Sequence, residues 1–207
     1  LHVHSTFSFC SFIPEDLIHR AVKEGLYAMA LTDHDTVGGI PRFLAAAEGK
    51  PVVAVPGVEI SADFSPGTMH MLGYFVDPKN ETLNSRLQWL REGRDARNQE
   101  ILHKLIKQGF HISWAEVKKY AEEDVVGRPH FAQALLARGY VANKDEAFDL
   151  YLGKGKPAYA ERRRLTMKDS IGLISGAGGV AVLAHPFTLK LPSKQLKELV
   201  RDLYDFG

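Results

Sequence analysis

The chain has 207 residues, of which 45% are hydrophobic, with 26 Lys and Arg against 25 Asp and Glu. This length and hydrophobic content allow one large domain, or one domain with a smaller insertion, around a sizeable core. The near-balance of charge excludes binding to nucleic acid or to a membrane surface through the overall charge of the molecule, and it leaves local binding of nucleic acid open.

Three further features of the sequence bear on the compartment. Cys10 is the only cysteine, which excludes a disulfide within the chain and favours a reducing environment. No apolar run approaches the ~20 residues that a membrane span needs. The opening residues, Leu1 to His4, are neither a signal peptide nor a natural start, so we expect that residues were trimmed before Leu1. We therefore expect a soluble, cytoplasmic protein with no membrane partner.

The first third of the chain alternates helix and strand patterns. Hydrophobic spacing predicts helices over residues 15–25 and 38–48, and strands over residues 26–31, 52–55 and 69–76. Alternation of this kind is typical of an α/β fold whose strands pair mainly in parallel.

The middle of the chain changes character. From about Thr82 to Tyr151 the pattern is almost entirely helical, and one apolar stripe is formed by Leu83, Leu87 and Leu90. This predicts a helical insertion subdomain over residues 82–165, between an α/β segment of residues 1–81 and a second one of residues 166–207.

The α/β pattern resumes after the insertion. We predict a helix over residues 167–175, a strand over residues 180–184 and a last helix over residues 194–203. A further strand ought to follow Gly207, so we expect the chain to be part of a longer protein.

The first candidate for chemistry is the pair His2 and His4. Residues two apart on a strand point to the same side, so both imidazoles can face one point. Neutral imidazoles suit Zn, Mn or Fe. Taken alone, such a pair indicates a metal site no more strongly than it indicates chance or core packing.

A second candidate group, Asp33-His34-Asp35, directly follows a strongly apolar predicted strand. The carboxyl ends of strands are where α/β folds place their active sites. The alternative is a polar turn in which Asp35 caps the next helix, which accounts for one aspartate but not for all three residues.

Glu59 lies inside an apolar strand pattern. A carboxylate in such a position costs free energy unless it is paired or bound to metal, and bridging two metals would offset that cost. The alternative is a strand residue that faces solvent.

Histidines also follow or occupy two later predicted strands. His70 lies within one, and His185 ends another. A lone histidine there is more often packed in the core than bound to metal. Five of the nine histidines, however, lie in or at the ends of predicted strands, and this joint pattern predicts a metal site: His2, His4, His34, His70 and His185.

The motifs around these residues resemble, in order, the successive motifs of the PHP (polymerase and histidinol phosphatase) family. They are residues 1–5, 30–36, 56–60 and 184–186. Within the predicted insertion, residues 127–131 and 152–157 resemble the branch of the family that hydrolyses nucleotide monoesters and short nucleic-acid ends. The resemblance covers essentially the whole chain.

The resemblance implies a distorted (β/α)7 barrel, incomplete in this chain, with two or three divalent metal ions (Mn, Fe or Zn) at the carboxyl ends of its strands. The implied metal ligands are His2, His4, His34, Glu59, His70 and His185. Glu59 would bridge a first metal, held with His2 and His4, to a second one held by His70 and His185. His34 would belong to a third site, and Asp33 and Asp35 would orient imidazoles.

The resemblance also implies that residues of the insertion reach the substrate phosphate. Arg128 presents a planar fork that can bind two phosphate oxygens together. His130 would bind phosphate or protonate a leaving oxygen, and its alternative is a helix N-terminal residue without such a role. Lys154 and Lys156, in a loop with glycines, are expected to form a phosphate-facing flap.

Arg91, Arg94 and Arg97 recur at helical spacing and so share one face of a predicted helix. This face either guides a nucleotide tail or is a solvated charged surface, and we expect the solvated surface.

The sequence departs from the family in two places. Phe9 and Cys10 stand where relatives have an acidic residue, which serves the third metal site, and a glycine. We expect Cys10 to be a small buried apolar side chain. The family also has an Asp-x-His motif near its C-terminus, which this chain does not reach.

Metal-dependent hydrolysis of phosphoesters is the predicted function, because divalent ions both activate water at neutral pH and neutralise phosphoryl oxygens. The expected partner is a small phosphorylated substrate, either a nucleotide (a 3′,5′-bisphosphate or a monophosphate) or the 5′ end of a short RNA. Two alternatives stay open. One is a histidinol-phosphate-type phosphatase, which Arg128 and His130 disfavour, and the other is a binding or regulatory module with an impaired metal site.

Overall fold

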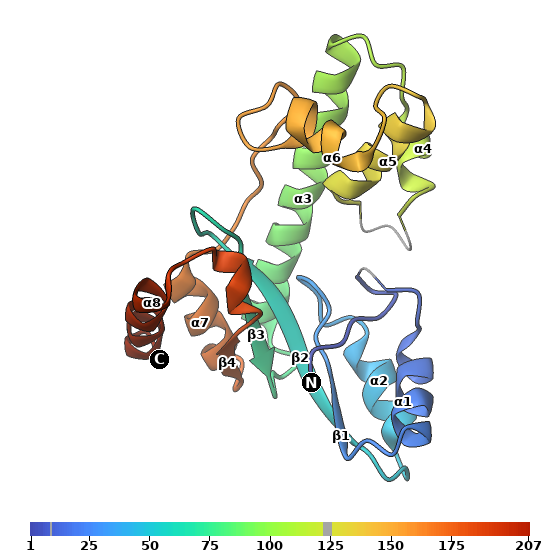
Figure 1. The fold of residues 1–207 in the computed structure, drawn as a ribbon. Coiled ribbons are helices and arrows are strands. Elements are labelled where there is room, and N and C mark those ends of the chain that lie inside the picture. Colours follow the sequence, from blue (N-terminus) through green and yellow to red (C-terminus); the bar gives the residue numbers. More distant parts are fainter. Residues whose placement is uncertain (9, 122–125) are drawn as a thin grey trace. The chain divides into compact units, whose positions relative to one another are not determined.

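The computed structural model of the protein describes residues 1–8, 10–121 and 126–207 (Figure 1). The chain forms two compact units. Unit 1 contains Leu1–Gln88 and Arg164–Gly207, and unit 2 contains Trp89–Arg163. Unit 1 carries all of the strands named below, and unit 2 is helical.

Unit 1 is built on a four-stranded sheet in the order β1-β2-β3-β4. Its strands are β1 (Ala28–Leu31), β2 (Val53–Ala62), β3 (Met69–Tyr74) and β4 (Val180–Leu183). Together with the surrounding helices, this sheet confirms a mixed α/β fold, and the sheet is open.

The prediction of mainly parallel pairing is wrong. Among the four named strands, β1 and β2 pair in parallel, whereas β2–β3 and β3–β4 are antiparallel. The loop between β2 and β3, residues 63–68, is far shorter than the crossover of about a dozen residues that two parallel strands require. Hydrophobic spacing identified the strands, but it carries no information on their relative direction.

Four α-helices of unit 1 lie close to their predicted positions. They are α1 (Pro14–Lys23), α2 (Ile40–Ala47), α7 (Met167–Gly176) and α8 (Ser193–Asp205). In α1, Pro14 occupies the first turn, where its missing N–H costs nothing, and Lys23 complements the dipole at the other end. Helices α1 and α2 pack on each other and against β1 and β2, and α7 packs on β2, β3 and β4 (Figure 1).

Two of the isolated bridges beside the carboxyl ends of β1 and β2 hold the segments that carry histidines. Val3 pairs with Leu31, and His34 pairs with Glu59, both in parallel. The backbone N–H of Thr32 donates to Val3 O, and that of Asp35 donates to Glu59 O. The first residues of the chain and the segment after β1 are therefore fixed beside β2.

Unit 2 has its own hydrophobic core. Helix α3 (Glu81–Lys107) begins in unit 1 and continues in unit 2, which also contains α4 (Trp114–Lys118), α5 (Arg128–Ala137), α6 (Lys144–Ala147) and the π-helix η1 (Phe148–Leu152). Its buried side chains include Ile101, Leu105, Phe131, Leu135 and Leu152.

The expectation of a solvated arginine face on α3 is wrong. Arg91 is exposed, but Arg94 and Arg97 are only 5% and 7% exposed. Helical spacing identifies residues that share a face, but it does not determine whether that face is covered.

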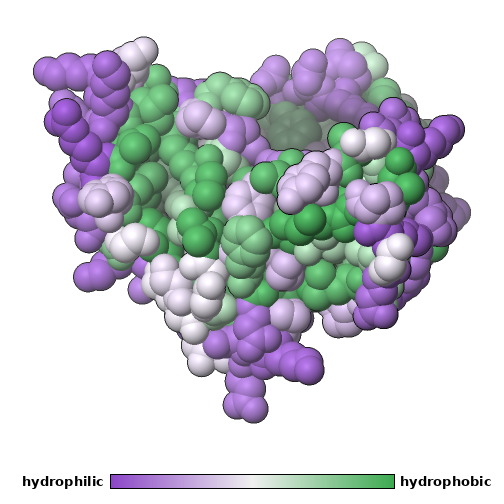
Figure 2. All heavy atoms as spheres, turned by 90° about the horizontal axis from the view of Figure 1, so that it is seen from below, coloured by the Kyte–Doolittle hydropathy of each residue, from purple (hydrophilic) through white to green (hydrophobic). Residues whose placement is uncertain are grey.

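Apolar side chains also reach the surface of unit 1. Val180 and Val182 of β4, which lies at an edge of the sheet, are 58% and 39% exposed. Figure 2 shows hydrophobic side chains among hydrophilic ones across the face of the molecule seen from below. Among the described residues, no helix combines the length and the hydrophobicity needed to cross a membrane.

Candidate metal centre

The centre of the site is the carboxylate of Glu59 in β2. Glu59 is 1% exposed and lies between Val58 and Ile60, which are both fully buried. Within the part of the chain that the structure describes, the ion-pair partners of Glu59 are five histidines and no Lys or Arg. The prediction of a carboxylate inside an apolar strand is confirmed, and the alternative of a solvent-facing residue is wrong.

Five imidazoles surround the two oxygens of Glu59. On Oε2 the distances are 2.8 Å to His2 Nε2, 3.1 Å to His4 Nε2 and 3.3 Å to His34 Nε2. On Oε1 they are 2.7 Å to His70 Nδ1 and 3.0 Å to His185 Nε2. All five histidines that the sequence singled out are therefore gathered at one carboxylate.

Four segments of unit 1 deliver the five imidazoles. His2 and His4 flank Val3, whose bridge to Leu31 sends both rings to the same side. His34 follows β1, and His70 lies in β3, opposite Ser61 of β2. His185 follows β4 with a φ of 26°, a backbone conformation that costs free energy in a residue other than glycine and is concentrated at functional sites.

The site's electrostatics favour an ionised carboxylate and a neutral imidazole. Burial opposes the ionisation of Glu59, but hydrogen bonds with His4 and His70, together with the nearby His34, hold the pKa of Glu59 well below its ordinary value. Burial lowers the pKa of His34 from its ordinary 6.5 to about 3, against the opposing effect of Glu59. His34 is therefore neutral at pH 7, which is the form that binds metal.

This donor set fits divalent metal ions. Atoms that lie about 2.0–2.2 Å from one ion are roughly 3 Å apart, which matches the spacing between the ring nitrogens and the Glu59 oxygens. Two groups have their ligand atoms within 4.8 Å of one another: His2, Glu59 and His185, and His4, His34 and Glu59. Imidazole with carboxylate suits Zn, Mn or Fe.

Comparison with known proteins identifies the family. The family model for the PHP domain matches residues 1–203. The chain belongs to the PHP domain family. It is 34% identical over 207 residues to the 5′-3′ exoribonuclease of Haemophilus influenzae, which covers the whole chain and 75% of that protein. It is 32% identical over 208 residues to the 3′,5′-nucleoside bisphosphate phosphatase of Chromobacterium violaceum, covering the whole chain and 73% of that protein.

A solved structure has the same fold as this PHP domain. It is an amidohydrolase from Chromobacterium violaceum with bound sulfate, 32% identical, with a TM-score of 0.85 over the whole chain and 73% of the other. The likeness covers the strands and loops that carry the histidines and Glu59.

Asp33 does not orient an imidazole directly, contrary to expectation. Its carboxylate is 1% exposed and accepts hydrogen bonds from Ser5 N–H (2.7 Å), Ser5 Oγ–H (2.6 Å) and Ser8 Oγ–H (2.6 Å). Ser8 Oγ in turn lies 3.4 Å from His4 Nδ1. Asp33 therefore holds the loop after His4 and reaches that ring through Ser8.

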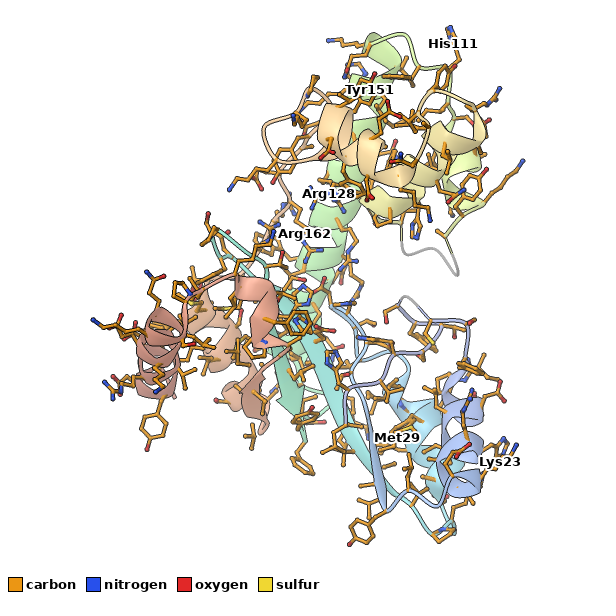
Figure 3. All side chains as sticks on the ribbon, viewed as in Figure 1. Lys23, Met29, His111, Arg128, Tyr151 and Arg162 are labelled. Carbon is orange, nitrogen blue, oxygen red and sulfur yellow. The ribbon has the colours of Figure 1, made fainter. Side chains whose placement is uncertain are left out.

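The predicted substrate residues of the PHP domain lie in unit 2. Arg128 (labelled in Figure 3) and His130 are in the first turn of α5. The Gly127 N–H donates to His130 Nδ1 at 3.0 Å. An Arg128 N–H donates to Leu152 O at 3.3 Å, directly before the loop with Lys154 and Lys156, which are both exposed. The structure thus groups Arg128 with this loop.

Two predictions concern Phe9 and Cys10. Phe9 lies outside the described residues. Cys10 is half-buried and not paired in a disulfide, so it is less buried than expected.

The sequence analysis missed three hydroxyl residues that support the histidines of the PHP domain. They are Ser5 and Ser8, which hold Asp33, and Thr188, whose Oγ1 lies 3.1 Å from His185 Nδ1. Each hydroxyl follows a predicted metal ligand within a few residues, but serine and threonine are too common for this spacing alone to identify them.

Proposed function

We propose that this PHP domain is a metal-dependent phosphoesterase that either removes phosphate from nucleotides (3′,5′-bisphosphates or monophosphates) or acts as a 5′-3′ exonuclease that removes nucleotides from the 5′ ends of short RNAs. The observation that carries the proposal is the convergence of five imidazoles on the buried carboxylate of Glu59. Imidazole nitrogens gathered around a carboxylate form a donor set for divalent metal ions, whereas the packing of a structural core does not require five imidazoles at one buried carboxylate.

The proposed ligands are divided between the two oxygens of Glu59. His2, His4 and His34 face Oε2, and His70 and His185 face Oε1. Glu59 belongs to both candidate ligand groups, so it would contribute to holding more than one ion. Ions bound there supply a nucleophile from water at neutral pH and neutralise the phosphoryl oxygens. The protein contributes by fixing the ligands in a buried setting, where the carboxylate is retained in its ionised form.

The substrate class is supported by the relatives. One of them is named as a phosphatase of 3′,5′-nucleoside bisphosphates and another as a 5′-3′ exoribonuclease. The related amidohydrolase binds sulfate, an anion with the tetrahedral shape of phosphate. We propose Arg128, His130, Lys154 and Lys156 as the phosphate-binding residues, with His130 also the donor of a proton to the leaving oxygen.

The proposal extends to the fold and to the compartment. The open sheet of unit 1 belongs to a distorted (β/α)7 barrel, and unit 2 is its helical insertion, with proposed boundaries near residues 82 and 165. The single half-buried cysteine favours the cytoplasm as the compartment.

The experiment that tests the function combines metal content with phosphate release. Purified protein is analysed for Mn, Fe and Zn. Phosphate release is measured from nucleoside 3′,5′-bisphosphates, nucleoside monophosphates and histidinol phosphate, and release of mononucleotides is measured from 5′-phosphorylated oligoribonucleotides. We expect two or more ions per chain and release from the nucleotide or RNA substrates. Fewer than one ion per chain after reconstitution, with no release, would favour the binding-module alternative.

The Glu59→Gln variant makes this test specific. Removing an outer-shell partner of a metal typically costs roughly 10–100-fold in affinity or activity, and Glu59 is proposed as a direct ligand, so we expect a loss of turnover above about 100-fold. Circular dichroism should show an unchanged fold. Glu198→Gln, at an exposed position in α8, is the matched control and should keep full activity. Unchanged turnover in Glu59→Gln would exclude the bridging role.

A further inference from the structure

We propose that Ser8 and Thr188 are positioning residues that hold the ring proton of His4 and of His185 on Nδ1, so that each ring presents Nε2 to the metal centre. The inference rests on the proposed metal-binding function of Glu59 and its histidines. It concerns two hydroxyl side chains that are not themselves among the proposed ligands.

The hydrogen bonds of Ser8 determine the direction of its contact with His4. A serine hydroxyl has one proton to donate. Ser8 is 1% exposed, and it donates to Asp33 Oδ1 over a short 2.6 Å, while the same carboxylate accepts from Ser5. The proton of Ser8 is thus committed to Asp33, and Ser8 Oγ can only accept from His4 Nδ1, 3.4 Å away. His4 must therefore carry its proton on Nδ1.

Thr188 is placed in the same way beside His185. Its hydroxyl donates to Thr68 O at 2.8 Å, and His185 O, at 3.0 Å, is the other acceptor in reach. With its proton committed to a backbone carbonyl, Thr188 Oγ1 can only accept from His185 Nδ1, which lies 3.1 Å away. This fixes the proton of His185 on Nδ1 and leaves Nε2 to face Glu59.

The consequence is visible at Glu59. His4 Nε2 and His185 Nε2 approach its oxygens to 3.1 and 3.0 Å, and in a neutral ring with its proton on Nδ1 each of these nitrogens brings a lone pair towards an oxygen lone pair. Two facing lone pairs repel unless a cation lies between them, and either a metal ion or a second ring proton on Nε2 meets this need. The hydroxyls therefore leave Nε2 of both rings as the nitrogen that faces Glu59 and is available to a metal ion.

The two positioned histidines are divided between the two candidate ligand groups. His185 belongs to the group with His2 and Glu59, and His4 belongs to the group with His34 and Glu59. His70, by contrast, presents Nδ1 to Glu59. Because the rings of this site do not all use the same nitrogen, each needs its own means of selecting one, and the hydroxyls supply it for one ring in each group.

The sharpest test uses Thr188→Val, which removes the hydroxyl and nearly keeps the shape, with Thr188→Ser as the control that restores it. Zn²⁺ affinity is measured by competition with a chromophoric chelator, and long-range ¹H–¹⁵N NMR reads which ring nitrogen of His185 carries the proton. We expect Thr188→Val to lose roughly 10–100-fold in Zn²⁺ affinity, with the proton no longer confined to Nδ1, and Thr188→Ser to behave as the parent protein.

Ser8→Ala is the corresponding variant for His4 and should give the same loss, with the ring signals of His185 unchanged. This second variant decides the question if Thr188→Val does not fold. A parent protein in which Nδ1 of His4 or of His185 is not protonated would overturn the inference, as would a Thr188→Val protein that binds Zn²⁺ like the parent.

Failure of the proposed function would look different. A parent protein that binds no Zn²⁺ would remove the metal function, whereas the NMR measurement on the metal-free protein would still report whether Nδ1 is protonated in both rings. If Nδ1 is protonated in the metal-free protein, the proposed role of Ser8 and Thr188 stands even without metal binding. If Nδ1 is not protonated, that role is contradicted.

Discussion

At the scale of single residues, Arg128 has its guanidinium supported on several sides. The guanidinium carbon lies 5.9 Å from the ring centre of Phe148 and 5.5 Å from that of Tyr159, and an N–H donates to Leu152 O. A planar cation stacks on aromatic faces in a way that an ammonium group does not reproduce. The side chain is therefore oriented by the protein in advance of any phosphate.

Arg128→Lys tests this orientation. The variant keeps the positive charge but loses the planar fork and its stacking on the aromatic rings. We expect kcat/KM for a nucleoside 3′,5′-bisphosphate to fall about tenfold or more, because one lost hydrogen bond to a charged group costs about 1.5 kcal/mol. Metal content should not change, because Arg128 is not a proposed ligand. Full kcat/KM in the variant, or a loss of metal, would contradict the assignment. Arg91→Lys, on an exposed side chain, is the control.

Single residues also show where sequence reasoning succeeds. A carboxylate in an apolar strand and histidines at strand ends are conspicuous, because burying them without a use is costly. Ser8 and Thr188 are small hydroxyl residues that occur everywhere in proteins, so only coordinates reveal their hydrogen bonds. Arg94 was assigned to solvent because charged residues are rarely buried, and its burial depends on tertiary packing that no local pattern encodes.

At the scale of elements, the segment after β4 is tied to the loop before β3. In the 3-10 helix η2 (Pro186–Leu189), Thr188 O accepts from the Thr68 N–H at 3.0 Å, and Thr188 Oγ1 donates to Thr68 O at 2.8 Å. This pair of bonds joins the element after His185 to the strand that carries His70. Gly67 permits the approach, because a Cβ there would lie against Thr188 O and within 2.5 Å of Leu189 C.

Gly67→Ala should therefore separate η2 from the β2–β3 loop. Since the obstruction is backbone and not a flexible side chain, we expect a loss of about 1–3 kcal/mol in the free energy of unfolding, as for an overpacked core, with a weaker affinity for Zn²⁺. Gly172→Ala is the matched control: Gly172 is exposed within α7, with no atom within 4 Å of its Cβ position. It should gain about 0.5–1 kcal/mol. Chemical denaturation measures both, and equal stabilities would refute the close-approach argument.

Elements also mark the limit of what spacing can predict. The helices and strands of unit 1 were found from hydrophobic periodicity, since each buries one face or both. Hydrophobic periodicity could not predict that β3 runs antiparallel to β2, because this direction depends on the short loop of residues 63–68 and on the pairing of Ser61 with His70. That pairing is what brings the His70 ring to the Glu59 carboxylate.

At the scale of the whole molecule, the candidate metal centre belongs to one unit only. Glu59 and all five histidines lie within Leu1–Gln88 or Arg164–Gly207, although more than a hundred residues of sequence separate His70 from His185. Unit 2, by contrast, has a separate hydrophobic core. The helical character of the insertion was evident in the sequence, whereas the return of the chain to the same sheet after it depends on the pairing of β4 with β3.

This division predicts how the molecule responds to metal. A ligand that binds only the folded state stabilises it by about 2.7 kcal/mol at a hundred times its dissociation constant, and local opening of the segments that hold it is suppressed accordingly. We expect hydrogen exchange of β2, β3 and the segments around His4, His34 and His185 to slow on addition of Zn²⁺. Exchange in Trp89–Arg163 should not change, because no proposed ligand lies there.

The Glu59→Gln variant should lose most of the protection in unit 1, since it lacks the carboxylate that joins both ligand groups. Protection spread evenly over unit 2 would mean that the two units open as one, and protection that persists in Glu59→Gln would place the metal elsewhere in the protein.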